Sequence, residues 1–164
     1  MERLTIAIVI LFLLPSPAHA AAGDAARESR CIEASALYNR IPALLLRSIR
    51  LQEGGRVGGW SFNRDGSIDY GVMQINSRWL PLLTRQGYSA AVLTYDSCAC
   101  IAAGAWILVQ ALARYGAWNR SDIDGRVYWR AIGDYHSHTP ALNRAYAEQV
   151  WTRYRRQAAT GGMP

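Results

Sequence analysis

The chain contains no lysine, so its 18 basic residues are all arginines, and they leave a formal net charge of +6. A basic protein can be attracted to nucleic acid, to anionic lipid or to an acidic wall polymer. The arginines are scattered, apart from a small group at Arg153, Arg155 and Arg156, and no nucleic-acid-binding motif accompanies them. We therefore expect no nucleic-acid partner.

Long apolar runs are missing after the first twenty residues, so the sequence predicts no membrane-spanning helix there. The beginning differs, because Leu4–Leu14 is almost entirely apolar, Pro15 and Pro17 follow, and Ala18-His19-Ala20 is a small-x-small cleavage site. This order is typical of a secretory signal peptide (1–20). We expect cleavage after Ala20, a periplasmic or otherwise exported protein without stable membrane insertion, and a loose leader over residues 21–30.

Cysteine is scarce, and three residues leave one thiol over if two of them pair. A bridge between Cys98 and Cys100 would close a very tight ring, which is geometrically unfavourable. Cys31 is therefore expected to pair with Cys98 or with Cys100 in an exported protein. The cysteines lack the spacing of a zinc site, and His136-x-His138 is not combined with them, so we expect no metal and no cofactor.

Helical patterns dominate the rest of the chain, and one segment interrupts them. The predicted helices cover residues 31–38, 43–53, 77–83, 89–93, 98–115 and 126–134, and a last one starts near Pro140 with Leu142, Tyr146 and Val150 along one face. Residues 56–70 are rich in turn formers and predict a small β-hairpin. The sequence thus predicts a mainly α (α+β) fold, with one domain over residues 31–157 and a tail over 158–164.

Glu53 is the main candidate for chemistry. Leu46, Ile49 and Glu53 fall at helical spacing on one apolar stripe, and Gly54-Gly55 ends the helix behind them. A carboxyl group that faces a core loses hydration, which raises its pKa and lets it donate a proton near neutral pH. The alternative is a helix-end glutamate that leans into water beyond the glycines, and periodicity alone does not separate the two.

The segment from Asn63 to Trp79 reads NRDGSIDYGVMQINSRW. It resembles the central signature shared by animal-type lysozymes and by the small soluble lytic transglycosylases of bacterial type III and type IV secretion and conjugation systems. In both groups the catalytic glutamate ends a helix shortly before this segment, as Glu53 does. The similarity to the transglycosylases continues through residues 96–108 and 129–140. It implies a lysozyme-like fold, with a β-hairpin beside an active-site cleft that takes peptidoglycan glycan strands.

The resemblance also implies roles for individual residues. Tyr135 matches the tyrosine that helps to position the catalytic glutamate, and the residues expected to contact substrate are Ser67, Met73, Gln74 and Asn76. Each of these four has a structural alternative, as a turn residue, a partner for backbone groups or a core side chain. Many relatives have serine after the glutamate where this chain has Gly54, and Ser67 is a candidate to replace it.

For the cysteines, the resemblance favours a disulfide between Cys31 and Cys98. Cys100 stands where relatives often have asparagine, which leaves its role open.

Asp69 occupies the place of the second carboxylate of lysozyme, and a retaining glycosidase needs two carboxyl groups about 5 Å apart. Some secretion-associated transglycosylases also carry an aspartate here, so Asp69 does not decide the mechanism. The match to the transglycosylases covers more of the chain than the match to the lysozymes, and it therefore favours a lytic transglycosylase. Such an enzyme is a lyase that leaves 1,6-anhydromuramoyl ends, and here it would open the wall locally for secretion or conjugation machinery. A lysozyme-type muramidase using Glu53 and Asp69 is the second hypothesis, and a non-catalytic peptidoglycan-binding assembly protein is the third.

Overall fold

The fold is described from a computed structural model, which covers residues 17–161 and describes side chains from residue 23 onward. In chain order its elements are α1 (Pro17–Asn39), α2 (Ala43–Glu53), β1 (Trp60–Phe62), β2 (Ile68–Tyr70), β3 (Ile75–Asn76), η1 (Ser77–Trp79), α3 (Leu80–Leu83), η2 (Thr84–Gln86), α4 (Ala90–Tyr95), α5 (Ser97–Arg114), α6 (Gly125–Gly133) and α7 (Pro140–Ala159). The predicted signal peptide lies outside the described residues except for positions 17–20, which begin α1. The fold class is mainly α with one small antiparallel sheet, as the sequence predicted.

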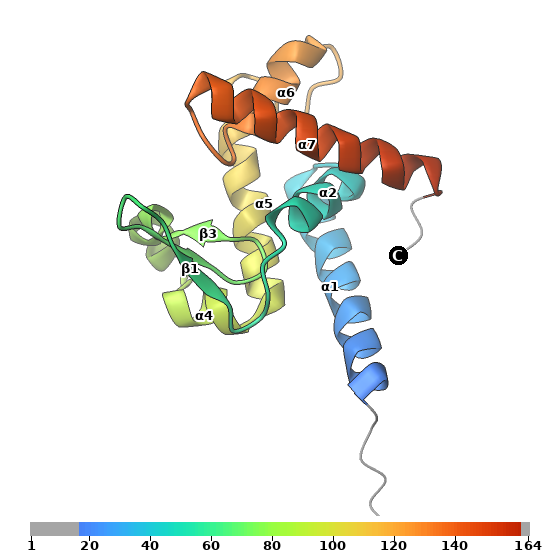
Figure 1. The fold of residues 1–164 in the computed structure, drawn as a ribbon. Helices are drawn as coiled ribbons and strands as arrows, with labels where there is room; N and C mark the ends of the chain where they lie inside the picture. Colours follow the sequence, from blue (N-terminus) through green and yellow to red (C-terminus); the bar gives the residue numbers. More distant parts are fainter. Residues whose placement is uncertain (1–16, 162–164) are drawn as a thin grey trace, which may run out of the picture.

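The long helix α5 runs through the middle of the molecule, where α1, α4, α6 and β3 all contact it (Figure 1). Asp96 caps its N-terminus, because the carboxylate accepts hydrogen bonds from the backbone N–H groups of Cys98 and Ala99. Ile101 and Leu108 are fully buried on this helix. By length and composition α5 could span a membrane, but most of it is buried inside the fold, as is usual for a core helix.

The first helix is longer than the sequence pattern indicated. α1 is continuous from Pro17 to Asn39, so residues 21–30, which we expected to form a loose leader, are helical. This stretch is rich in alanine, the strongest helix former, and it lacks the apolar periodicity on which the prediction depended. An ion pair holds it against α2, because the guanidinium of Arg50 donates to the Glu28 carboxylate at 3.0 Å.

A disulfide joins α1 to the start of α5. Cys31 and Cys98 are bonded, their Cα atoms lie 5.2 Å apart, and 67 positions separate them in the sequence. The residues alone left two pairings open, and the structure has the one that the resemblance implied. Cys100, one position beyond Ala99 on α5, keeps a free and buried thiol.

Three short strands form the antiparallel sheet in the order β1-β2-β3 (Figure 1). β1 and β2 are the predicted hairpin, and the backbone N–H of Asn63 donates to the carbonyl of Ser67 at 2.8 Å across its turn. The third strand was not predicted, because two residues are too few to produce a detectable alternation. Its Asn76 lies opposite Asp69 in the register of β2 and β3.

The last two helices meet at a buried polar cluster. We expected Leu142, Tyr146 and Val150 to share the inner face of α7, and the last two are indeed buried, but Leu142 is 52% exposed. Asn143 is buried in its place and donates to the carboxylate of Asp134 at 2.7 Å. The helix therefore turns a polar residue inward, where it supplies a hydrogen bond to a buried carboxylate.

Candidate active site

Glu53 is the last residue of α2 and continues the apolar stripe of that helix. Leu46 and Ile49 on the same stripe are fully buried, and the helix ends at Gly54 in the left-handed conformation, with φ 62°. The side chain of Glu53 lines a cavity of about 880 Å³. Of the two alternatives for this residue, the structure has the one in which the carboxyl group follows the core-facing stripe.

The surroundings of Glu53 raise the pKa of its carboxyl group from 4.5 to about 7. Burial is the main cause, because a carboxylate loses its hydration in the protein interior. A hydrogen bond from Tyr146 acts in the opposite direction, and the negative charge of Asp69 raises the pKa further. A carboxyl group with this pKa is about half protonated at neutral pH, so it can act as an acid and afterwards as a base.

Tyr146 of α7 is the side chain that touches this carboxyl group. Its hydroxyl donates to Oε1 of Glu53 at 2.5 Å. Burial raises the pKa of Tyr146 well above its usual value, so the phenol keeps its proton and remains a donor. Sequence reasoning treated Tyr146 only as a core residue; the available signal was that a buried tyrosine hydroxyl needs a hydrogen-bond partner.

Tyr135, which the resemblance implied would help to position the glutamate, lines the same cavity as Glu53 but directs its hydroxyl to another group. Its hydroxyl donates to the backbone carbonyl of Met73 at 3.1 Å. Its ring stacks on the ring of Tyr146, with centroids 6.2 Å apart and planes inclined by 16°. The other neighbour of Tyr146 is His136, whose ring is 5.0 Å away and nearly parallel. Tyr135 and His136 thus flank the Tyr146 ring, and both also line the Glu53 cavity.

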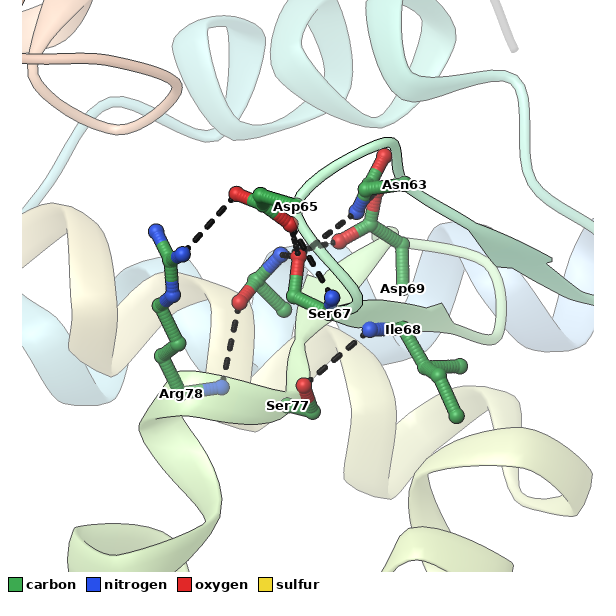
Figure 2. A network of polar contacts seen from close by, with 8 residues as sticks. Asn63, Asp65, Ser67, Ile68, Asp69, Ser77 and Arg78 are labelled. Carbon is green, nitrogen blue, oxygen red and sulfur yellow. Dashed lines mark hydrogen bonds and ion pairs between the residues drawn. The ribbon is translucent and has the colours of Figure 1, made fainter.

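The second carboxylate, Asp69, is held by two amides from neighbouring segments (Figure 2). Asn63 donates to Oδ2 at 2.9 Å and Asn76 donates to Oδ1 at 2.7 Å. The same two amides donate to the hydroxyl of Ser67, which itself donates to Asp65 at 2.6 Å. With each carboxylate oxygen engaged, the side chain of Asp69 is fixed in orientation at the wall of the Glu53 cavity.

The same network ties the hairpin to the segment that follows it. The backbone N–H of Ile68 donates to the hydroxyl of Ser77 at 3.0 Å, and Arg78 forms an ion pair with Asp65 at 2.9 Å (Figure 2). Ser67 is only 6% exposed at the centre of these contacts. Its hydroxyl is therefore used mainly inside the hairpin, although Ser67 also borders the cavity.

The predicted sugar-contacting residues occupy different positions. Gln74 and Asn76 both line the cavity. Gln74 adopts a positive φ of 46°, and its amide donates to the Gly71 carbonyl at 2.9 Å while accepting from Ser61 at 3.0 Å. Met73 was expected along the cleft, but its side chain is fully buried and does not line the cavity. An apolar side chain at this position gains more from burial in the core beneath the hairpin.

The end of α2 and the end of the hairpin touch through their backbones. A Cβ atom built on Gly55 would collide with the carbonyl oxygen of Gly71. Gly71 itself has φ 63°, and a Cβ there would collide with the carbonyl oxygen of Leu93. Glycine is therefore required at both positions, at Gly55 by its contact with Gly71 and at Gly71 by its positive φ and its contact with Leu93.

Cys100 lies beneath the turn between β2 and β3. Its sulfur accepts from the backbone N–H of Met73 at 3.4 Å and lies 3.6 Å from the Tyr70 carbonyl, to which the thiol donates. Burial raises the pKa of this thiol to about 11, so it stays protonated at neutral pH. Cys100 therefore acts as a hydrogen-bonding support for the turn that carries Gln74.

The remaining wall of the cavity mixes apolar and polar groups. It is formed by Arg78, Trp79, Leu82, Ile107, His136, Ser137, His138, Thr139 and Leu142, among others. Hydroxyl, amide and imidazole groups beside apolar surfaces suit a polyhydroxylated ligand. Within residues 17–161, no three His, Cys, Asp or Glu side chains are grouped so as to hold a metal ion.

The fold and the cavity together define a mainly α protein in which one cleft contains a protonatable glutamate and an amide-held aspartate. No protein-family model matches the chain. It is 33% identical over 130 residues to invasion protein IagB of Salmonella typhimurium, an alignment that covers 76% of this chain and 74% of that protein. It is also 33% identical over 127 residues to protein IpgF of Shigella flexneri, covering 74% and 76%. The chain belongs to the family of these proteins.

A more distant relative covers more of the chain. The X polypeptide of Escherichia coli is 26% identical over 161 residues, which are 94% of this chain and 84% of that protein.

Proposed function

We propose that this protein is a peptidoglycan lytic transglycosylase, which cleaves the β-1,4 bond between N-acetylmuramic acid and N-acetylglucosamine and leaves 1,6-anhydromuramoyl ends. The observation that carries the proposal is the largely desolvated carboxyl group of Glu53, whose pKa of about 7 suits a general acid, at the wall of a cleft of about 880 Å³. The substrate, peptidoglycan, is inferred from the resemblance of residues 63–79 to lysozymes and lytic transglycosylases.

The reaction uses Glu53 twice. Its carboxyl group donates a proton to the glycosidic oxygen as the bond from C1 to that oxygen breaks. The resulting carboxylate then takes the proton of the muramoyl 6-hydroxyl as that oxygen bonds to C1, so no water is consumed. Tyr146 donates to Oε1 of Glu53, which leaves Oε2 to carry the acidic proton.

Asp69 contributes negative charge near the sugar. Its two hydrogen bonds from Asn63 and Asn76 fix it at the cavity wall. A fixed carboxylate stabilises the positive charge that develops on the sugar ring in the transition state. Because the 6-hydroxyl is tethered to the reacting sugar, proximity supplies much of what a second carboxylate supplies when free water attacks.

The same position of Asp69 favours a second candidate function, hydrolysis by a lysozyme-type muramidase. In that reaction Asp69 would act as the nucleophile or stabiliser and water would be the final acceptor. A peptidoglycan-binding assembly protein without turnover is the third candidate, and the intact pair of Glu53 and Asp69 disfavours it.

We further propose that the chain matures by cleavage after Ala20 and works outside the cytoplasm. The disulfide between Cys31 and Cys98 supports this, because such bonds persist in oxidising compartments. A role in opening the wall for a secretion or conjugation apparatus is supported by the relative named as an invasion protein.

The decisive experiment is digestion of purified peptidoglycan, with mass spectrometry of the soluble products. We expect muramoyl products that are one water lighter than reducing ends. Glu53→Gln should lower turnover by about 10²–10⁴-fold, which is the usual contribution of general acid catalysis. Asp24→Asn is the control and should retain activity, because this carboxylate is exposed on α1 and lines neither cavity. More than a tenth of wild-type turnover in Glu53→Gln would refute the assignment of the acid.

A further inference from the structure

A second cavity, of about 630 Å³, lies between α6 and α7. It is lined by Arg126, Trp129, Arg130, Asp134, His138, Pro140, Asn143, Arg144, Ala147, Glu148 and Trp151, and we call it the α6–α7 groove. Asp134 and His138 line both this groove and the Glu53 cavity. The imidazole of His138 contacts the Asp134 carboxylate at 2.9 Å. The two cavities are therefore neighbours that share one wall.

The groove is positively charged. Arg126, Arg130 and Arg144 line it, against two acidic side chains. One of these, Asp134, is buried and already engaged, because it accepts hydrogen bonds from Asn143 and Tyr115 and pairs with His138 and Arg114. Glu148 is then the one exposed carboxylate that lines the groove.

Arg130 stacks on the ring of Tyr115, but the other two groove arginines make few interactions with the protein itself. Arg126 pairs only at 3.5 Å with Asp124 and its side chain is 95% exposed, which makes this a weak interaction. Arg144 takes part in no ion pair within the part of the chain that the structure describes. Both guanidinium groups are available to a ligand that carries carboxylates.

The floor of the groove is aromatic. Trp129 and Trp151 line it, with ring centroids 4.9 Å apart, and both pack against Tyr154. Packing among these rings limits their movement, so the floor is a preformed surface for small apolar groups. A ligand that suits the groove therefore combines carboxylates with short aliphatic parts.

From these observations we propose that the α6–α7 groove binds the anionic peptide stem attached to the muramoyl residue in the cleft. This inference rests on the proposed function. A stem peptide is short, has several free carboxylates and methyl side chains, and begins at the sugar that Glu53 acts on. Since the groove shares a wall with the cleft, a stem that leaves the muramoyl residue over Asp134 and His138 enters it directly.

The first test compares two substrates, peptide-bearing glycan strands and the same strands after an amidase has removed the peptides. The measured quantity is the ratio of kcat/KM for the two. In Arg126→Gln/Arg144→Gln this ratio should fall about fivefold, as expected for two exposed ionic contacts. Arg85→Gln/Arg156→Gln removes the same charge from arginines that line neither cavity, and its ratio should equal that of wild type.

A ratio unchanged in the groove variant, or lowered equally in the control, would overturn the proposal, since only general attraction to an acidic polymer would then remain. The second test is independent of turnover. Released stem peptide is titrated into Glu53→Gln while tryptophan fluorescence is recorded, because Trp129 and Trp151 line the groove. We expect a saturable change that is lost when Arg126 and Arg144 are also replaced.

The absence of a saturable change, or its persistence in that combined variant, would mean that the groove has another occupant, such as a protein partner, and the proposal would be wrong. A wild-type protein that releases no product from either substrate would instead refute the proposed function. The fluorescence titration distinguishes the two failures, because it measures peptide binding without catalysis.

Discussion

Replacing Glu53 by glutamine should make the protein more stable at alkaline pH. The carboxyl group has a pKa of about 7 in the folded protein against 4.5 when unperturbed. Between these values the folded chain holds a proton that the unfolded chain has lost, so the free energy of unfolding falls as pH rises. Glutamine has no proton to lose and still offers an oxygen to Tyr146, so the variant avoids this loss.

The size of the effect follows from the two pKa values. The interval from 4.5 to about 7 is about 2.5 pH units, and each unit corresponds to about 1.4 kcal/mol, which gives roughly 3 kcal/mol. The contribution is complete below pH 4.5 and lost above pH 7. The advantage of Glu53→Gln should therefore be about 3 kcal/mol larger at pH 8 than at pH 4, which for a domain of this size is roughly 10 °C in Tm.

Thermal unfolding of both proteins at pH 4, 6 and 8 tests this. Glu148→Gln is the control, because that side chain is exposed on α7 and its replacement relieves no burial. A difference in Tm between Glu53→Gln and wild type that stays the same from pH 4 to pH 8 would contradict this reasoning, because the folded protein would then not raise the pKa of the Glu53 carboxyl group.

Three further predictions concern the hydroxyl, the second carboxylate and the disulfide around this site. Tyr146→Phe removes a hydrogen bond that lowers the pKa of Glu53, so the alkaline limb of the kcat/KM profile should move up by about 1–2 pH units. Tyr135→Phe is the control and should move this limb less. A downward shift with Tyr146→Phe would be inconsistent with the assigned hydrogen bond. Asp69→Asn removes a charge that raises the pKa of Glu53, so the limb should move down while substantial activity remains. A dead Asp69→Asn variant, together with entirely reducing products from wild type, would identify a hydrolase instead. Reduction of the bond between Cys31 and Cys98 should lower the free energy of unfolding by about 4 kcal/mol in the chain-entropy account. Denaturant unfolding with and without reductant measures this change. Recovery of Cys31 as a free thiol by non-reducing peptide mapping would refute the pairing.

The sequence was most informative where a periodic apolar pattern is followed by residues that end a helix or form a turn. The helix over residues 43–53 was predicted, because apolar spacing fixed its buried stripe and Gly54-Gly55 fixed its end. The hairpin was predicted from its turn residues, although its third strand was not. The same pattern placed Glu53 on the apolar stripe, but it did not separate a core-facing carboxyl group from one that leans into water.

Features that depend on contacts between distant segments were not predictable in this way. The helicity of residues 21–30 comes from alanine propensity together with ion pairs such as that of Glu28 and Arg50. The partner of Glu53 is a tyrosine 93 positions later, and periodicity could place Tyr146 only in the core. Met73 was expected in the cleft because the resemblance implied it, but its side chain is fully buried in the core and does not line the cavity.

The backbone contact between Gly55 and Gly71 has a consequence for changing what this cleft accepts. Since main chain meets main chain there, the separation between the end of α2 and the turn that carries Gln74 is set by the path of the polypeptide and not by side chains. Variation in the ligand is more readily accommodated at exposed positions of the cavity wall, such as Leu82 and Leu142. Selection or engineering for a different glycan would therefore alter the outer binding positions first and leave the point of bond cleavage as it is.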